Sequence, residues 1–142
     1  MPSKNVKIDV NVDVDKLYNG GSIDACCSLS DDNGGKTPTG KPEQFESNVY
    51  AAKKVTWEPE KKGDNVNRYD FDLSKIEYED GDNIFGKDSL PAGANGKVVG
   101  DVESSANVGA EEKYMIKFAI TQKRGSTKNF EIDPILKVSQ GG

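Results

Sequence analysis

The sequence of 142 residues contains no histidine and only two cysteines. Without histidine the chain cannot form a Ser-His-Asp or Cys-His catalytic arrangement, and it lacks the commonest zinc ligand. The cysteines, Cys26 and Cys27, are adjacent, and a disulfide between neighbours on an extended chain would strain the backbone. We therefore expect two small, buried, free thiols, which fit a reducing compartment.

Clustered positive charge and long apolar runs are also missing. No run of lysine or arginine exceeds two residues, and the formal net charge is −5. This charge pattern disfavours binding to nucleic acids and to anionic membrane surfaces. No window approaches the 18 apolar residues of a membrane span, and the N-terminus lacks the apolar core of a signal peptide. The sequence therefore predicts a cytoplasmic protein.

The motifs of common enzyme classes are missing as well. Neither a phosphate-binding G-x-x-x-x-G-K-[ST] loop nor a G-x-G-x-x-G dinucleotide fingerprint occurs. Two of the 24 acidic residues could in principle hydrolyse a glycoside, but no spacing in the sequence selects a pair. We therefore expect no enzymatic activity.

What the chain does contain is alternation of apolar and polar residues. The clearest run is 6–15, VKIDVNVDVD, in which every second residue is aliphatic. A two-residue period is typical of a β-strand with one buried face. Its polar side carries Asp9, Asn11, Asp13 and Asp15. Because a strand rises about 3.3 Å per residue, Asp9 and Asp13 would stand roughly 13 Å apart, so we expect a solvated face rather than a metal site.

Further alternating runs follow, separated by segments rich in glycine, asparagine, aspartate and proline, whereas no segment of ten residues has a helical period. Many short strands between turns predict an all-β fold. We expect a single domain over residues 1–142, an antiparallel β-sandwich of the jelly-roll or Greek-key kind with seven or eight strands. A polar stretch at about 30–44 is predicted to be a long loop.

Four local features refine this prediction. The alternation changes phase at Ser74-Lys75, which indicates a bulge. Asn95-Gly96 is a hairpin signal, and Pro59 is expected to end a strand. Pro134 interrupts the last alternating run, which predicts a kink or an edge strand there.

The candidate binding residues are few. The acidic turns offer Asp31 and Asp32, and also Asp80 and Asp82, whose carboxylates could hold calcium, the one cofactor we consider. Turns favour aspartate on backbone grounds alone, so a solvated turn is the competing interpretation. Trp57, the only tryptophan, could form an aromatic platform for a sugar, or it could lie in the core.

Two segments near the ends of the chain stand out, VKIDVNVDVDKLY and, over residues 114–138, YMIKFAITQKRGSTKNFEIDPILKV. They resemble the opening strand and the closing hairpin of the AidA/PixA-type inclusion body family of bacterial proteins. The matching residues of the hairpin are Tyr114, Ile116, Phe118, Phe130, Asp133 and Pro134. The resemblance implies a jelly-roll-like sandwich that accumulates or self-assembles in the cytosol, and it assigns no functional residues.

Two functions therefore compete. The first is a non-enzymatic structural or inclusion-type bacterial protein that self-associates into a homo-oligomer or larger assembly, with sheet edges near Pro134 and at the first strand as contact surfaces. The alternative is a lectin-like module that binds carbohydrate through calcium or through an aromatic platform.

Overall fold

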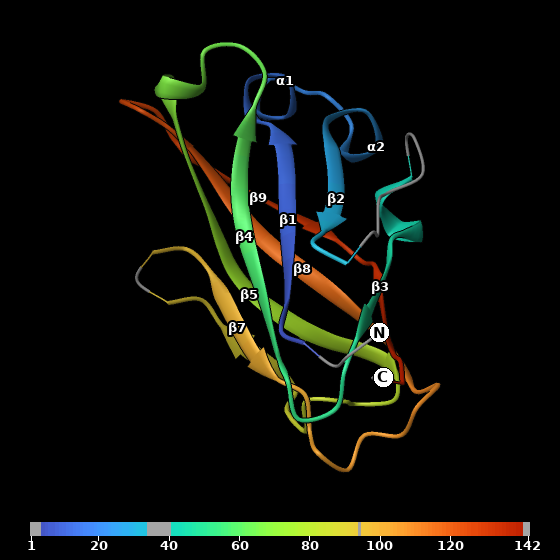
Figure 1. The fold of residues 1–142 in the computed structure, drawn as a ribbon. Coiled ribbons are helices and arrows are strands. Elements are labelled where there is room, and N and C mark those ends of the chain that lie inside the picture. Colours follow the sequence, from blue (N-terminus) through green and yellow to red (C-terminus); the bar gives the residue numbers. More distant parts are fainter. Residues whose placement is uncertain (1–3, 34–40, 94, 141–142) are drawn as a thin grey trace.

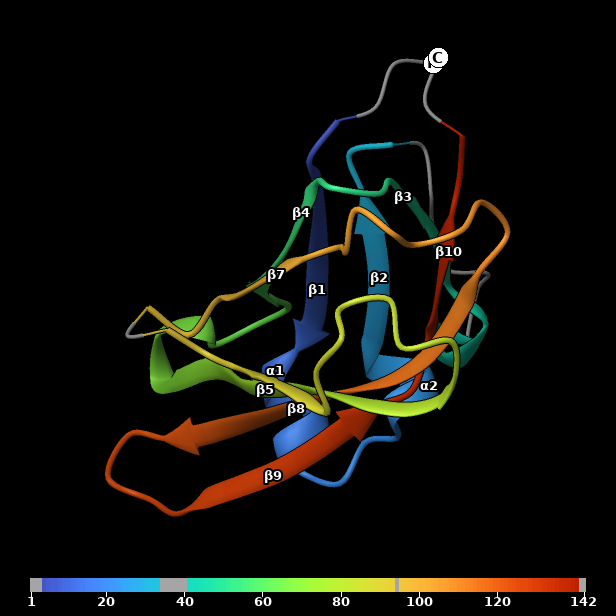
Figure 2. The same ribbon diagram turned by 90° about the horizontal axis from the view of Figure 1, so that it is seen from below.

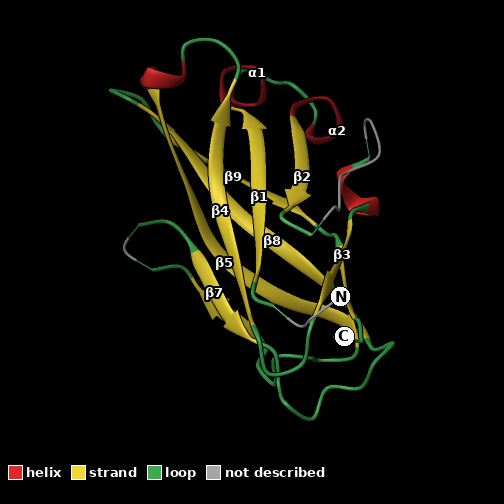
Figure 3. Cartoon of the chain, viewed as in Figure 1, coloured by secondary structure: helices red, strands yellow, loops and turns green. Residues whose placement is uncertain are grey.

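The computed structural model describes residues 4–33, 41–93 and 95–140. Two β-sheets pack face to face, with two short helices at one end of the strands (Figure 1). Figure 3 shows how strongly strands dominate the chain. The predicted all-β sandwich is confirmed.

The smaller sheet, sheet A, has four strands in the order β2-β1-β4-β7. These strands are β1 (Val6–Asp13), β2 (Cys27–Asp31), β4 (Lys54–Lys62) and β7 (Val98–Asp101). Sheet B has six strands, in the order β3-β10-β8-β5-β6 with β9 also paired to β8. They are β3 (Glu46–Val49), β5 (Tyr69–Gly81), β6 (Ser89–Pro91), β8 (Glu111–Gln122), β9 (Thr127–Ile132) and β10 (Ile135–Val138). The short helices are α1 (Val14–Tyr18), α2 (Ile23–Cys26), η1 (Pro42–Gln44) and η2 (Val66–Arg68).

The core forms where the apolar faces of the two sheets meet. The aliphatic side chains of β1 point inward and are fully buried, as are Tyr114, Ile116 and Ile120 of β8. Burying one large apolar side chain contributes about 1.5–3 kcal/mol. Along β1 the apolar residues are buried and the polar residues between them are not. The polar residues of β1 thus lie on the outer face, as predicted.

The pairing of the strands differs from the purely antiparallel prediction. β1 runs parallel to β4 over the whole of β1, from Val6 opposite Val55 to Asp13 opposite Lys62, and β10 runs parallel to β3. Parallel neighbours need a long connection, and the chain between β1 and β4 provides one by forming β2 and β3 on the way. Ten strands are present among the described residues, more than the seven or eight predicted, because several are only three to five residues long.

Two helices replace predicted strand residues. Asp13 ends β1 and caps α1, its carboxylate accepting from Lys16 N at 3.3 Å. Asp15 therefore lies in α1 and not on the strand, and it accepts from Tyr69 Oη at 2.5 Å. That hydrogen bond holds the pKa of Asp15 below its usual value. Ser22 caps α2 in the same way, by accepting from Ala25 N at 3.1 Å, so the alternating run that follows the first one becomes a strand only at Cys27.

Both cysteines are free and buried, as predicted. Cys26 ends α2 and Cys27 begins β2. Burial raises the pKa of the Cys27 thiol to about 12 and also raises that of Cys26. Since only the thiolate is reactive, both thiols act as small apolar side chains.

The bulge at Ser74 is confirmed, since the register of β5 on β8 shifts between Leu73 and Lys75. The prediction for Pro59 is wrong, because β4 continues through it to Lys62. β7 pairs with β4 only as far as Trp57. No described strand therefore pairs with Pro59 on the β7 side of β4. Proline has no N–H to donate, and at this unpaired position no hydrogen bond is lost.

The predicted hairpin at Asn95-Gly96 is wrong in its partners. Gly96 adopts a positive φ of 75°, and Gly93 N donates to Lys97 O at 2.8 Å, so a tight turn does form. However, the turn leads from β6 in sheet B to β7 in sheet A. It carries the chain between the two layers and does not join two paired strands.

Pro134 produces the predicted kink, and the edges near it are only partly as expected. β9 and β10 lie on the same side of β8, one beyond the other, and the strand breaks between them at Asp133-Pro134. β10 is enclosed by β3 and β8, whereas β9 borders sheet B. The first strand, β1, lies between β2 and β4, so the expectation of an edge there is wrong.

The predicted loop at 30–44 is shorter in the described part of the chain, because β2 reaches Asp31 and η1 occupies Pro42–Gln44. Residues 34–40, in the middle of that stretch, lie outside the described residues. Among the residues that the structure does describe, no helix is long and apolar enough to cross a membrane.

Trp57 occupies the centre of the core. Its ring packs edge-on against Phe85 and Tyr114, with ring centroids 5.8 and 5.7 Å apart. Its indole Nε1 donates to Tyr114 Oη at 3.2 Å, a buried hydrogen bond between the two sheets. A buried donor without an acceptor costs about 1–3 kcal/mol. The hydrogen bond therefore favours this one arrangement of the Trp57 and Tyr114 rings, in addition to their apolar contact.

We predict that Tyr114→Phe lowers the free energy of unfolding by about 1–3 kcal/mol, because it leaves the Trp57 N–H buried and unpaired. Urea unfolding followed by Trp57 fluorescence measures the change. Tyr78→Phe is the matched control, since Tyr78 Oη donates to Gly81 O at an exposed position where water can replace it. Equal losses in the two variants would contradict the prediction.

Candidate functional site

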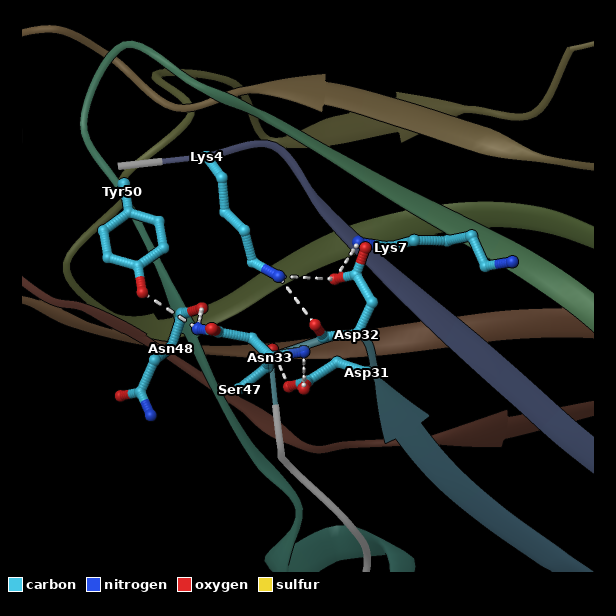
Figure 4. A network of polar contacts seen from close by, with 8 residues as sticks. All are labelled: Lys4, Lys7, Asp31, Asp32, Asn33, Ser47, Asn48 and Tyr50. Carbon is cyan, nitrogen blue, oxygen red and sulfur yellow. Dashed lines mark hydrogen bonds and ion pairs between the residues drawn. The ribbon is translucent and has the colours of Figure 1, made fainter. Parts of the chain in front are cut away.

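The predicted ligand residue Asp31 lies in a polar network that joins the sheets (Figure 4). Its Oδ2 accepts from Ser47 Oγ at 2.6 Å, and its Oδ1 accepts from Asn33 N at 2.8 Å. Asn33 Nδ2 donates onward to Asn48 O at 3.2 Å and to Tyr50 Oη at 3.0 Å. Because Ser47 is buried, the network holds the end of β2 against β3 and has a structural role.

Asp32 links the end of β2 to the start of β1. Its Oδ1 accepts from Lys7 N at 3.0 Å, and its backbone oxygen accepts from Lys4 Nζ at 2.6 Å. Lys4 Nζ also lies 3.8 Å from the carboxylate. The hydrogen bonds of both carboxylates, Asp31 and Asp32, therefore hold strand ends together.

Asp80 and Asp82 stabilise the turn that follows β5. Asp80 Oδ1 accepts from Gly81 N at 2.8 Å, and Asp82 Oδ2 accepts from Glu111 N at 3.1 Å. Gly81 has a positive φ of 81°, and a Cβ there would lie 2.5 Å from Glu111 O, so the turn requires glycine. Within the described ranges no three acidic or cysteine side chains are grouped so as to hold a metal ion. Calcium binding stays a prediction.

The burial of Trp57 contradicts the predicted aromatic platform. Its side chain is 0% exposed, so no face of the ring is accessible to a sugar. The alternation of β4 places Val55 and Trp57 on the same inward side, and the facing sheet then covers them both. The competing interpretation, a core aromatic, is the one the structure supports.

Glu112 is a buried acid that was not among the predicted site residues. It lies on β8 with only 1% of its surface exposed, and its Oε1 accepts from Ile84 N at 2.9 Å. Ile84 and Phe85, both buried, belong to the segment that closes this end of the core. A signal was present in the sequence, because Glu112 shares the parity of the inward residues Tyr114 and Ile116.

Burial raises the pKa of Glu112 to about 7, and the hydrogen bond from Ile84 N opposes the shift. Desolvation disfavours the carboxylate because few groups replace its lost water. The side chain therefore titrates near neutral pH.

A hollow of about 380 Å³ lies along β5, β8 and β9. It is lined by Ser74, Lys117, Phe118, Asn129, Phe130 and Glu131. Lys117 opposes Glu131 across the two strands, but its Nζ lies 3.5 Å from Glu77. None of the predicted site residues lines this hollow.

Comparison with known proteins shows that the fold also occurs in a solved structure. The chain is similar to the crystal structure of an inclusion body protein, PixA, from Burkholderia cenocepacia J2315, with a TM-score of 0.70 and 12% sequence identity over 98% of each chain. No protein-family model and no curated protein match the sequence. The expected resemblance to this kind of protein is thus confirmed at the level of the fold.

We predict that the stability of this chain falls as pH rises, with Glu112 responsible for the change. The folded-state pKa of about 7 lies above the ordinary value of 4.5, so the folded protein binds this proton more tightly than the unfolded chain does. The stabilisation is fully present below the ordinary pKa and is lost as pH rises through about 7. Its size is on the order of 3 kcal/mol.

The variant Glu112→Gln isolates this effect, because the amide is neutral and keeps an oxygen for the Ile84 N–H. Urea unfolding of both proteins between acidic and mildly alkaline pH measures it. The variant should be more stable than the parent above neutral pH and similar to it in acid. Parallel pH profiles for the two proteins would show that Glu112 does not titrate in this range.

Proposed function

We propose that this chain is a non-enzymatic bacterial protein of the inclusion-body type, which accumulates in the cytoplasm and acts by self-association. The observation that carries the proposal is the similarity of the whole fold, over 98% of both chains, to an inclusion body protein. That similarity is one of fold. The support for self-association comes from the border strands and the charge of the chain itself.

The architecture supports self-association because, over the described residues, neither sheet closes into a barrel, so each sheet keeps strands that are paired on one side only. Both sheets have border strands whose outer backbone groups can pair with another chain. The acidic side chains at Asp31, Asp32, Asp80 and Asp82 hold turns and strand ends together, and the buried thiols are protonated. The described border strands thus provide ways of contacting another chain.

Net charge sets the conditions for assembly. With a formal charge of −5 per chain, copies repel one another over about 10 Å at moderate ionic strength. Salt shortens this range, whereas hydrogen bonds between strand edges are little affected by it. Assembly should therefore need high protein concentration, and salt should favour it.

We predict that the average mass in solution rises with protein concentration, and that added salt moves the rise to lower concentration. Light scattering combined with sedimentation over a concentration series measures this. Parallel series with calcium and with a chelator test the competing metal-dependent module, and we expect no difference between them. A single-chain mass at every concentration and salt level would refute self-association.

A further inference from the structure

The borders of the two sheets differ in how much backbone they expose. β3 and β7 have four residues each and β6 has three, while the Asp31–Ser47 hydrogen bond ties β2 to β3. The open half of β4 contains Pro59. At the start of β5, Lys61 Nζ donates to Tyr69 O and Leu73 N donates to Gly96 O. β9, with six residues and no proline, is the longest border strand.

The register of β9 on β8 shows which of its backbone groups point outward. Gln122 N donates to Ser126 O, and hydrogen-bonded pairs alternate along an antiparallel ladder. The pairing is regular from Thr121–Thr127 to Ile116–Ile132. Thr127, Asn129 and Glu131 therefore direct their backbone N–H and C=O groups away from β8, and no described residue hydrogen-bonds to these groups.

The edge of β9 is exposed, and its inner side is held in place. Figure 2 shows β9 on the outer border of sheet B, with its hairpin turn projecting from the body. Thr127, Asn129 and Glu131 are exposed. On the inner side Lys128 Nζ donates to Tyr18 O at 2.8 Å, and Phe130 stacks on Phe118 with centroids 5.6 Å apart. The strand is therefore rigid before it meets a partner, which lowers the entropy lost on pairing.

We propose that β9 pairs antiparallel with β9 of a second copy of this chain, across a two-fold axis at Asn129. The inference rests on the proposed function, since it names the surface through which self-association begins. The pair joins two sheets B into one continuous sheet, an isologous contact of the commonest symmetry among homo-oligomers.

Charge and hydrogen bonding select this register. Residues that face each other across a continuous sheet must lie on the same side of it. An axis at Lys128 or at Glu131 would place that charge opposite its own copy, which destabilises the pair. An axis at Phe130 leaves the outward groups of Thr127 without a partner from β9. With the axis at Asn129, all three outward residues pair, Thr127 faces Glu131, and Lys128 faces Phe130.

The first test uses Asn129→Lys, which puts two ammonium groups opposite each other on the axis. The side chain is exposed, so the monomer should keep its fold and its unfolding midpoint. Asn67→Lys is the matched control, because it makes the same change at an exposed position of η2. We expect about tenfold weaker association for Asn129→Lys, roughly 1.4 kcal/mol, and parent-like association for Asn67→Lys.

The second test uses Asn129→Cys. In the proposed pair the Cα atoms of the two introduced cysteines lie about 5.5 Å apart, which is close enough for a disulfide. Mild oxidation followed by a non-reducing gel should give a covalent dimer, whereas Asn67→Cys should give little. Cys26 and Cys27 are buried and should not cross-link in the parent protein.

The outcomes separate the two proposals. If the parent associates, and Asn129→Lys associates as strongly while Asn129→Cys does not cross-link, the β9 pairing is wrong and the proposed function stands. If the parent remains a single chain throughout, both are wrong. Selective loss of association in Asn129→Lys, together with selective cross-linking of Asn129→Cys, supports the pairing.

Discussion

The contact between the inner faces of sheets A and B is the constraint on which the rest of the structure depends. β1 lies in sheet A and β8 in sheet B, and each strand buries every second side chain. Because the period of a strand is two, a shift of one residue in either would turn an apolar face toward water. The registers of the neighbouring strands, and the positions of the turns that join them, follow from that pairing of faces.

The buried and half-buried acids serve mainly to close the layers. Asp31 with Ser47 and Glu112 with the Ile84 N–H each link a strand to an element that packs beside or over it. Such groups are buried at a cost that hydrogen bonds offset only in part, which is why Glu112 titrates far from the ordinary range of a carboxylate.

One proline shapes the outer border of sheet B. Pro134 breaks what would have been a single long strand beside β8 into β9 and β10. β10 then receives β3 as a second neighbour, while β9 lies beyond the reach of β3 and keeps one side exposed. The break at Pro134 therefore has two effects: β10 is paired on both sides, and β9 is paired on one side only.

The sequence by itself determined that the alternating segments of β1 and β8 are strands, where β5 bulges and that the thiols are buried, because alternation and turn preferences act between near neighbours. It also indicated the fold shared with an inclusion body protein. Only the tertiary structure decided that β1 lies parallel to β4, that Trp57 is enclosed and that the Ile84 N–H donates to Glu112. Strand partners and enclosure depend on segments distant in sequence, and a residue's own pattern carries no information about what comes to lie against it.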